Sequence, residues 1–284
     1  MGSEAAAKRA LGPALMKAHR LNKRYIQRAP FSRKKFVIDA LVDIEIDITP
    51  GCLSALVGES GSGKSTLASC LAMSDKADSG EIWFEGQEIT GWNDRQLAQL
   101  RPRIQLVFQD SAGALNPRFS ASQIIEEPLE IQNRESGAKL RRRACEVMEE
   151  VGLSADWADR SPLEFSGGQR QRLAIGRAIA LKPALLILDE SLSGLDLSTQ
   201  AQILNLLLDL KSTHALTYLL ISHDLSLVGQ IADFVGVMHH GRLVEFGPMQ
   251  QVLGSPQHDE TRRLLASAGG VESAYRAAQA GGRA

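Results

Sequence analysis

A glycine-rich stretch, Gly58 to Thr66, constrains the fold of this chain more than any other part of its sequence. It reads GESGSGKST and fits the pattern G-x-x-x-x-G-K-[ST] in full, with a short apolar run, Leu53 to Val57, before it. Glycines let backbone N–H groups wrap around phosphate oxygens, Lys64 adds a positive charge for the outer phosphates, and the Ser65 hydroxyl can ligate Mg²⁺. The stretch therefore predicts a nucleoside triphosphate site between a buried strand and a helix.

A second segment, Glu164 to Asp196, predicts another place where an anion can bind. Ser166 can cap the helix-period run from Gln169 to Leu181, and Gly167 and Gly168 put no side chains in front of its free amides. A capped surface helix without a ligand is the alternative interpretation of these residues when they are taken alone.

The same segment ends in a buried strand followed by two acids. Lys182-Pro183 stops the helix, because proline has no amide hydrogen and restricts the residue before it. Ala184 to Leu188 is an unbroken apolar run, short enough for a strand that is buried on both faces. Asp189 and Glu190 then stand at its carboxyl end, where open α/β sheets bind their ligands, although two solvated acids would look the same.

Composition and charge narrow the class of protein. The 284 residues, 44% apolar and 23% charged, suit a soluble globular chain with one large domain, or a core with a subdomain. A net charge of −1 gives no electrostatic case for a nucleic-acid partner. No apolar stretch approaches the roughly 20 residues that cross a bilayer. The three cysteines lack metal-ligand spacing and indicate reduced thiols in the cytosol.

Alternating apolar and polar residues predict an antiparallel layer. The alternation runs through Ala14 to Tyr25 and again through Phe36 to Ile48, as in half-buried strands. Asp78 to Gly91 adds a hairpin to the same layer. Further elements are expected as a helix over Thr199 to Leu210, a strand pair over Phe234 to Met238 and Leu243 to Phe246, and a helix near Asp259 to Ser267.

A long helical pattern separates two strands of the nucleotide core. It runs from about Ser120 to Trp157 and is expected to break at Pro128 and near Gly137. We therefore predict a helical subdomain inserted at about 112–164.

Two polar residues follow other buried strands. Gln109 comes directly after Arg103 to Phe108, and His223 lies two residues beyond Leu216 to Ile221. In isolation Gln109 is typical of a polar loop, and a lone histidine such as His223 is usually exposed or a satisfied core residue. Their position after core strands makes both candidates for the nucleotide site, because parallel strands end at one edge of a sheet.

Together these residues resemble the nucleotide-binding subunit of an ABC transporter, over roughly Ala14 to Ala266. The corresponding motifs are the phosphate loop Gly58 to Thr66, the Q-loop residue Gln109, the signature Phe165 to Gln169, the Walker B strand Leu185 to Asp189 followed by Glu190, the D-loop Ser193 to Asp196, and the switch residue His223. Tyr25 matches the aromatic residue that stacks on adenine, with Phe36 as the substitute candidate.

The resemblance implies an α/β fold. Its parts would be a P-loop NTPase core with a RecA-like, mostly parallel sheet, an antiparallel β subdomain, and an inserted α-helical subdomain. The ABC ATPase domain would span 14–266, between a flexible N-terminal segment 1–13 and a flexible tail 267–284.

The resemblance also implies ATP and Mg²⁺ as cofactors and gives each motif a role. Glu190 would polarise the attacking water, Lys64 and His223 would stabilise the γ-phosphate, and Gln109 would sense it. The residues expected to contact ATP are Tyr25, Gly58, Glu59, Ser60, Gly61, Ser62, Gly63, Lys64, Ser65, Thr66, Gln109 and Asp189, with Ser166, Gly167, Gly168 and Gln169 supplied by a second subunit. The metal ligands would be Ser65, Gln109 and Asp189.

Several stretches of the amino-acid sequence are most similar to those of ATPases of oligopeptide and dipeptide importers. Among them are FQDSAGALNPRF, EFSGGQRQR and VLGSPQHDETRRLL. The expected function is therefore ATP hydrolysis that powers peptide import. Expected partners are a second ATPase subunit arranged head to tail, membrane permease subunits and a substrate-binding protein, without nucleic acid. The expected location is the cytoplasmic face of the inner membrane.

Other functions remain open at this stage. The same motor could serve nickel, antimicrobial peptides or oligosaccharides. A soluble ABC ATPase acting on DNA or ribosomes lacks support, since the chain shows no coiled-coil insert and no zinc-binding cysteine pairs. A P-loop kinase or GTPase would leave the signature and the D-loop unexplained.

Three residues depart from the usual family pattern. Phe165 replaces a leucine of the signature, Ser191 stands where proline usually follows the Walker B glutamate, and Gly194 replaces an alanine in the D-loop. None of them removes a group that the chemistry needs. The chain has no cysteine after Cys145, so we expect no iron–sulfur cluster.

Overall fold

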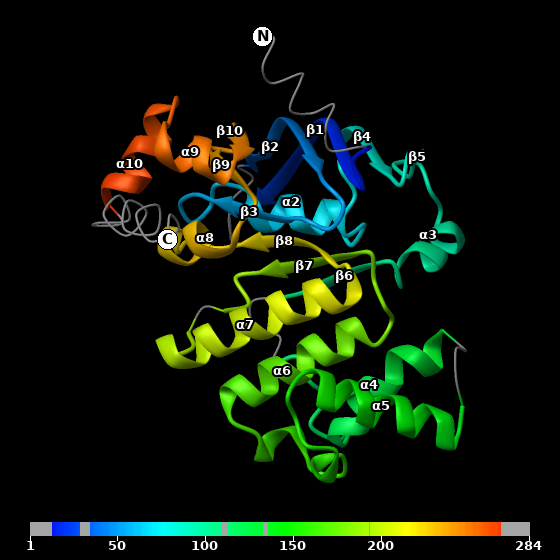
Figure 1. Ribbon diagram of the computed structural model, residues 1–284. Coiled ribbons are helices and arrows are strands. Elements are labelled where there is room, and N and C mark those ends of the chain that lie inside the picture. Colours follow the sequence, from blue (N-terminus) through cyan, green and yellow to red (C-terminus); the bar gives the residue numbers. More distant parts are fainter. Residues whose placement is uncertain (1–12, 29–34, 109–112, 133–135, 193, 268–284) are drawn as a thin grey trace. The chain divides into compact units, whose positions relative to one another are not determined.

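The computed structural model describes residues 13–28, 35–108, 113–132, 136–192 and 194–267 (Figure 1). The chain divides into two compact units, Met1–Asp94 with Tyr218–Ala284, and Arg95–Thr217. Among the described residues, no helix is both long enough and apolar enough to cross a lipid bilayer.

The first unit contains the predicted antiparallel layer. Its strands are β1 (Met16–Arg28), β2 (Lys35–Ile48), β4 (Ser79–Phe84) and β5 (Gln87–Glu88), in the order β2-β1-β4-β5. β1 pairs antiparallel with both of its neighbours. The alternation in β2 has the expected effect: Ile44, Ile46 and Ile48 are buried, while Glu45 between them is exposed. The predicted strands and the hairpin are confirmed.

The first unit also holds parallel strands that carry the phosphate loop. β3 (Leu53–Val57) lies between β8 (Thr217–Ile221) and β9 (Phe234–His239) and pairs parallel with both. β10 (Arg242–Pro248) pairs antiparallel with β9. Every residue of β3 and β8 is buried, as expected for continuous apolar runs. The helices of this unit are α2 (Lys64–Leu71), α8 (Leu225–Ile231), α9 (Met249–Gly254) and α10 (Asp259–Ser267).

The hairpin of β9 and β10 turns at His240 and Gly241, as predicted. Both residues have positive φ, 46° and 75°, which is the backbone of a tight two-residue hairpin turn. A Cβ on Gly241 would lie 2.9 Å from the carbonyl oxygen of Asp39 in β2, so glycine is required here for close approach as well as for φ.

The second unit is mostly helical around a short parallel strand pair. β6 (Ile104–Val107) and β7 (Leu185–Asp189) are parallel. The helices are α3 (Asp94–Leu100) at the boundary, α4 (Ala121–Ile131), α5 (Ala138–Glu150), the 3₁₀ turns η1 (Ala155–Trp157) and η2 (Pro162–Glu164), α6 (Gly167–Ile179) and α7 (Leu197–His214). Figure 1 shows α4, α5 and α6 together in green, and each of the three contacts the other two.

The expected helix break at Pro128 is wrong, because α4 continues through it. A proline inside a helix loses one backbone hydrogen bond, a cost of about 3 kcal/mol. Two features offset this cost. A capping box joins Ser120 and Gln123 at the start of α4, and Ile124, Ile125 and Leu129 bury its apolar face. The expected break near Gly137 is confirmed, since Gly137 is the N-cap of α5.

Helix ends also differ from the sequence pattern. α6 begins at Gly167 instead of Gln169, and α7 runs over Leu197–His214 instead of Thr199 to Leu210. In both cases the residue before the helix, Ser166 or Asp196, accepts a backbone hydrogen bond from the first turn and so extends the helix toward itself.

Candidate nucleotide-binding site

The loop between β3 and α2 has the backbone that its glycines were expected to provide. Gly58, Gly61 and Gly63 have φ values of 149°, 79° and 104°. A Cβ on Gly58 would lie 2.2 Å from the carbonyl oxygen of Met238, and one on Gly63 would lie 2.3 Å from that of Ala40. Neither backbone oxygen can move aside like a flexible side chain, so larger residues are excluded at both positions. The loop is held tightly against β9 and β2.

Lys64 places its ammonium group inside this loop. The side chain is only 4% exposed, and its Nζ donates to the carbonyl oxygens of Gly58 at 2.8 Å and Glu59 at 2.9 Å. The loop is tied to the β9–β10 turn as well, because Gly241 N donates to Ser62 O at 2.9 Å. A positive charge surrounded by a glycine backbone is the arrangement that binds a chain of phosphates.

The remaining loop residues present polar groups. Glu59, Ser60 and Ser65 are exposed, whereas Thr66 is partly buried. Ser65 belongs to the first turn of α2, whose N-cap Gly63 offers no capping side chain. The loop therefore combines a buried lysine with exposed hydroxyl groups, and triphosphate binding by these residues stays a prediction.

His223 lies at the same sheet edge as the phosphate loop. β3 and β8 are parallel, with Leu56 paired to Ile221, and Ser222 N donates to Leu56 O at 3.1 Å. Both strands thus end together, so Gly58 and His223 follow neighbouring strand ends. His223 is exposed, directly before the helix cap Asp224, and is available to a ligand.

Tyr25 in β1 is connected to the segment that follows α2. Its hydroxyl donates to Asp75 Oδ2 at 2.7 Å, and Lys23 Nζ donates to Asp75 Oδ1 at 2.7 Å. Burial and the hydrogen bond to Asp75 raise the pKa of Tyr25, so the phenol stays protonated. Burial alone would raise the pKa of Asp75, but the hydrogen bonds from Lys23 and Tyr25 lower it below its ordinary value.

These hydrogen bonds fix the position of Tyr25, which is 36% exposed. Phe36, the substitute candidate for stacking on adenine, is 55% exposed. Sequence reasoning missed Asp75, since an acid just beyond a helix carries no distinctive local pattern. Stacking of Tyr25 on adenine stays a prediction.

In the second unit, the signature segment begins α6 with a complete capping box. Ser166 Oγ accepts from Gln169 N at 3.3 Å, and Ser166 N donates to Gln169 Oε1 at 2.9 Å. Phe165, just before the cap, is buried and meets Trp157 edge to face with 6.0 Å between the ring centroids. The larger ring at this signature position is therefore accommodated by an aromatic partner.

The two signature glycines have different structural surroundings. A Cβ on Gly168 would lie 2.5 Å from Thr199 Cγ2, whereas one on Gly167 would meet only Leu195 Cδ2, at an ordinary 3.8 Å. Gly168 thus allows α6 to approach the start of α7 closely. From the sequence alone, both glycines were interpreted only as leaving room for a ligand. Nothing in the sequence around Thr199 indicated that its side chain would lie against Gly168.

The two acids lie at the carboxyl end of β7, as expected. Asp189, the last residue of β7, is 7% exposed, and Glu190 is partly buried with a positive φ of 44°. A non-glycine residue in this region is strained, by about 1–3 kcal/mol, and such strain is concentrated at functional sites. At the D-loop end, Asp196 caps α7, and its hydrogen bonds from the backbone and side chain of Thr199 lower its pKa.

The predicted site residues therefore fall into two groups. The phosphate loop, His223 and Tyr25 belong to the first unit, and the signature Ser166–Gln169 with Asp189 and Glu190 belongs to the second. Gln109 and the D-loop residue Ser193 lie outside the described residues.

The chain is similar to known proteins in its family pattern, its sequence and its fold. The family description "ABC transporter" matches residues 41–193. The chain is 43% identical over 259 residues to "Probable peptide ABC transporter ATP-binding protein y4tS" of Sinorhizobium fredii, which covers 91% of this chain and 73% of the relative. It is 42% identical over 254 residues to "Dipeptide transport ATP-binding protein DppF" of Escherichia coli, covering 89% of this chain and 76% of that protein.

A solved structure is similar over most of the chain. It is the dimeric, post-hydrolysis state of the ATP-binding cassette MJ0796 bound to ADP and Pi, with a TM-score of 0.72 and 28% sequence identity. The similarity covers 82% of this chain and 98% of that one. The expected fold class is confirmed.

Proposed function

The chain belongs to the ABC transporter family, and from this premise we propose that it is the ATP-binding and ATP-hydrolysing subunit of a peptide importer. The observation that carries the proposal is the phosphate loop, where backbone oxygens exclude any side chain at Gly58 and Gly63 and Lys64 is held inside. The names of two relatives, which specify peptide and dipeptide transport, support the cargo.

We propose that ATP binds with its phosphates in the loop Gly58–Thr66 and its adenine against Tyr25. Ser65, Gln109 and Asp189 would hold Mg²⁺, which when bound neutralises charge on the outer phosphate oxygens. Hydroxyl, amide and carboxylate oxygens are the ligands that this ion prefers, so the donor set fits it.

For the chemistry, we assign Glu190 to polarise the water that attacks the γ-phosphate. General-base assistance of this kind contributes about 10²–10⁴-fold in rate. Lys64 and His223 would stabilise the γ-phosphate as its charge redistributes, and Gln109 would sense the same group.

We further propose that Ser166 to Gln169 of one subunit covers the ATP that another subunit binds. The solved cassette structures that resemble this chain are described as dimeric. Contacts between the γ-phosphate and the capped start of α6 would exist only in the closed dimer, so ATP would shift the equilibrium toward closure. Hydrolysis would weaken those contacts and let the dimer open.

The partners follow from the same proposal. They are a second ATPase subunit, permease subunits in the membrane and a substrate-binding protein, and the location is the cytoplasmic face of the inner membrane. Two relatives are named as ATP-binding proteins of transport systems, which supports a peripheral position on a membrane complex.

The variant Glu190→Gln tests the catalytic assignment. We expect it to bind ATP with nearly wild-type affinity and to lose at least about 10²-fold in steady-state turnover. Glu149→Gln is the matched control, because Glu149 is exposed on α5 of the same unit and has no assigned role. Turnover of Glu190→Gln equal to that of the control would remove Glu190 from the chemistry.

The cargo needs a separate test. The chain should be co-expressed with permease subunits that co-purify with it from solubilised membranes, and the complex reconstituted in liposomes with a substrate-binding protein. ATP-dependent uptake of labelled dipeptides or oligopeptides is the expected result. Uptake of nickel or oligosaccharide without peptide uptake would reject the cargo and leave the ATPase assignment intact.

A further inference from the structure

Three side chains from distant parts of the sequence converge in the first unit. Glu59 belongs to the phosphate loop, His239 is the last residue of β9, and Glu260 lies in α10. One ligand atom from each, two carboxylate oxygens and a ring nitrogen, lies within 4.8 Å of both others. The sequence analysis gave no role to His239 or Glu260 and assigned Glu59 only to the phosphates.

Glu260 is the unusual member of this cluster. It is only 3% exposed, and no residue that the structure describes donates a hydrogen bond to its Oε1. That atom lies 3.3 Å from His239 Nδ1, and the other oxygen, Oε2, lies 3.4 Å from Arg263 Nη1. A buried carboxylate oxygen is costly without a partner, so this atom points to a cation that the cluster can hold.

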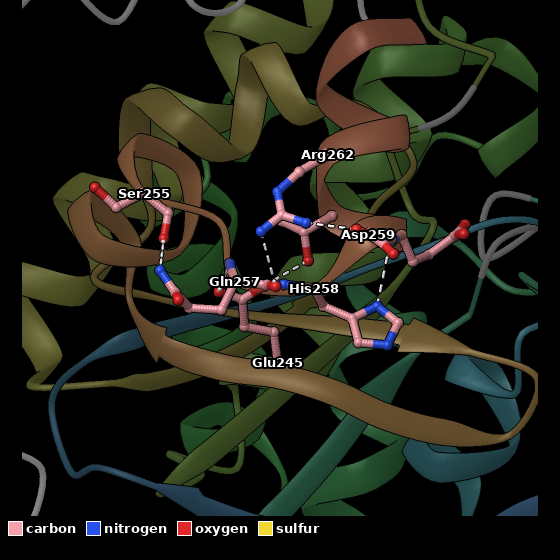
Figure 2. Close-up of polar contacts among 8 residues, drawn as sticks. Glu245, Ser255, Gln257, His258, Asp259 and Arg262 are labelled. Atoms are coloured by element: carbon pink, nitrogen blue, oxygen red, sulfur yellow. Dashed lines mark hydrogen bonds and ion pairs between the residues drawn. The ribbon is translucent and has the colours of Figure 1, made fainter.

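The backbone around Glu260 is firmly fixed. The Glu245 carboxylate accepts from Gln257 N at 3.0 Å and from His258 N at 3.2 Å, and the hydroxyl of Thr261 also donates to it, at 2.6 Å. Figure 2 shows Glu245 reaching from its strand toward the backbone that leads into α10. Glu260 N itself donates to His258 Nδ1. The backbone that carries Glu260 is thus held by Glu245 of β10.

We propose that Glu59, His239 and Glu260 bind a divalent transition-metal cation, with Zn²⁺ as the probe. Zn²⁺ is bound by His nitrogens and by Asp or Glu oxygens, and sites with three protein ligands keep a water in the fourth position. Bonds of about 2.0–2.1 Å in a tetrahedral site put neighbouring ligand atoms about 3.3–3.4 Å apart. The observed 3.3 Å between His239 Nδ1 and Glu260 Oε1 has that spacing.

The nearby charged groups favour this site over a simple ion pair. Two carboxylates, those of Glu59 and Glu260, face the single imidazole of His239. Arg263 is the nearest cation to Glu260, but its side chain is 76% exposed and contacts the far oxygen, so solvent screens its charge. The ring of His240 lies 4.1 Å from that of His239 and provides a neighbouring histidine outside the cluster.

A cation in this site would join α10 to the phosphate loop. Because Glu59 lies next to Gly58 in the loop, metal binding and nucleotide binding would change each other's affinity by the same factor. The proposal of a metal site does not depend on the proposed function, whereas the coupling between metal binding and nucleotide binding does.

Zn²⁺ titration of the purified full chain tests the site. The chain should carry a tag without histidine and be free of nucleotide, and binding should be followed by calorimetry. We expect one site that weakens at least about tenfold in His239→Gln and in Glu260→Gln, since even losing an outer partner of a metal ligand costs 10–100-fold. His240→Asn is the matched control, because asparagine tolerates the positive φ of that turn, and it should bind like the wild type.

Two results would overturn the proposal. One is the absence of stoichiometric Zn²⁺ binding to the wild type, and the other is equal binding by the wild type and both variants. Circular dichroism checks that the variants fold. If they do not, anomalous scattering from zinc-soaked wild-type crystals decides: a peak among Glu59, His239 and Glu260 supports the site, and peaks only elsewhere reject it.

The coupling is measured on the same samples by the affinity for ATP without Mg²⁺, with and without Zn²⁺. A Zn²⁺ effect in the wild type and in His240→Asn, absent from Glu260→Gln, is expected. If Zn²⁺ binds at the site but does not change the affinity for ATP, the coupling is rejected and the proposal of a metal site is retained.

Discussion

The substitution Gly168→Ala separates a steric role of the signature glycines from a role in ligand binding. The added Cβ would lie 2.5 Å from Thr199 Cγ2, closer than the 3.0 Å below which something must shift. Thr199 cannot easily rotate away, because its Oγ1 donates to Asp196 Oδ2 at 2.7 Å and its N donates to Oδ1 at 2.9 Å. Either this capping arrangement or the approach of α6 to α7 must change.

The expected magnitude follows from two opposing terms. Overpacking of a close contact costs about 1–3 kcal/mol. Replacing glycine by alanine inside a helix stabilises the helix by up to about 1 kcal/mol. We therefore expect Gly168→Ala to lower the free energy of unfolding by about 1–2 kcal/mol. Gly167→Ala, whose Cβ would make an ordinary 3.8 Å contact, should be neutral or slightly stabilising.

Thermal unfolding of the nucleotide-free chain by calorimetry measures this difference, which should appear as a lower Tm for Gly168→Ala than for Gly167→Ala by a few degrees. Thr199→Ser removes Cγ2 and keeps the hydroxyl, so the double variant Gly168→Ala/Thr199→Ser should recover most of the loss. Equal Tm values for the two alanine variants, or no recovery in the double variant, would refute the steric argument.

Three further predictions concern stability. Pro128→Ala should raise the Tm, because it restores the backbone hydrogen bond that α4 lacks, worth up to about 3 kcal/mol; an unchanged Tm would mean that packing of α4 already compensates. Ser191→Ala should be neutral or stabilising by about 1 kcal/mol, because the Ser191 hydroxyl is buried and has no hydrogen-bond partner among the described residues; a clear loss of Tm would reveal a missed partner. Asp75→Asn should destabilise the chain at neutral pH. Since the pKa of Asp75 is lower in the folded state, its contribution is present above the unfolded value of about 3.9 and is lost as the pH falls further, so the wild type and the variant should converge in denaturation curves below about pH 4; a constant gap would contradict this assignment.

Local chemistry in the sequence was sufficient for the phosphate loop and its flanking elements. Alternating residues in β2 can bury one face only as a strand, and the spacing of Gly58, Gly63 and Lys64 serves little besides a phosphate loop. Each of these sequence patterns spans about ten residues. Over such a length, the backbone geometry of a strand, helix or turn determines directly which side chains share a face. The helix through Pro128 was the failure of this reasoning, because packing against other helices outweighed a local penalty.

The tertiary structure alone decided which distant residues meet. Gly168 needs no side chain because Thr199 lies against it, and Tyr25 is fixed because Asp75 reaches it, but neither partner is recognisable in the sequence. His239 and Glu260 are likewise not recognisable as neighbours of Glu59 until β9 and α10 bring them beside the phosphate loop. The physical reason is that contact distances between such residues depend on how strands and helices pack, and a local pattern carries no information about packing partners far along the chain.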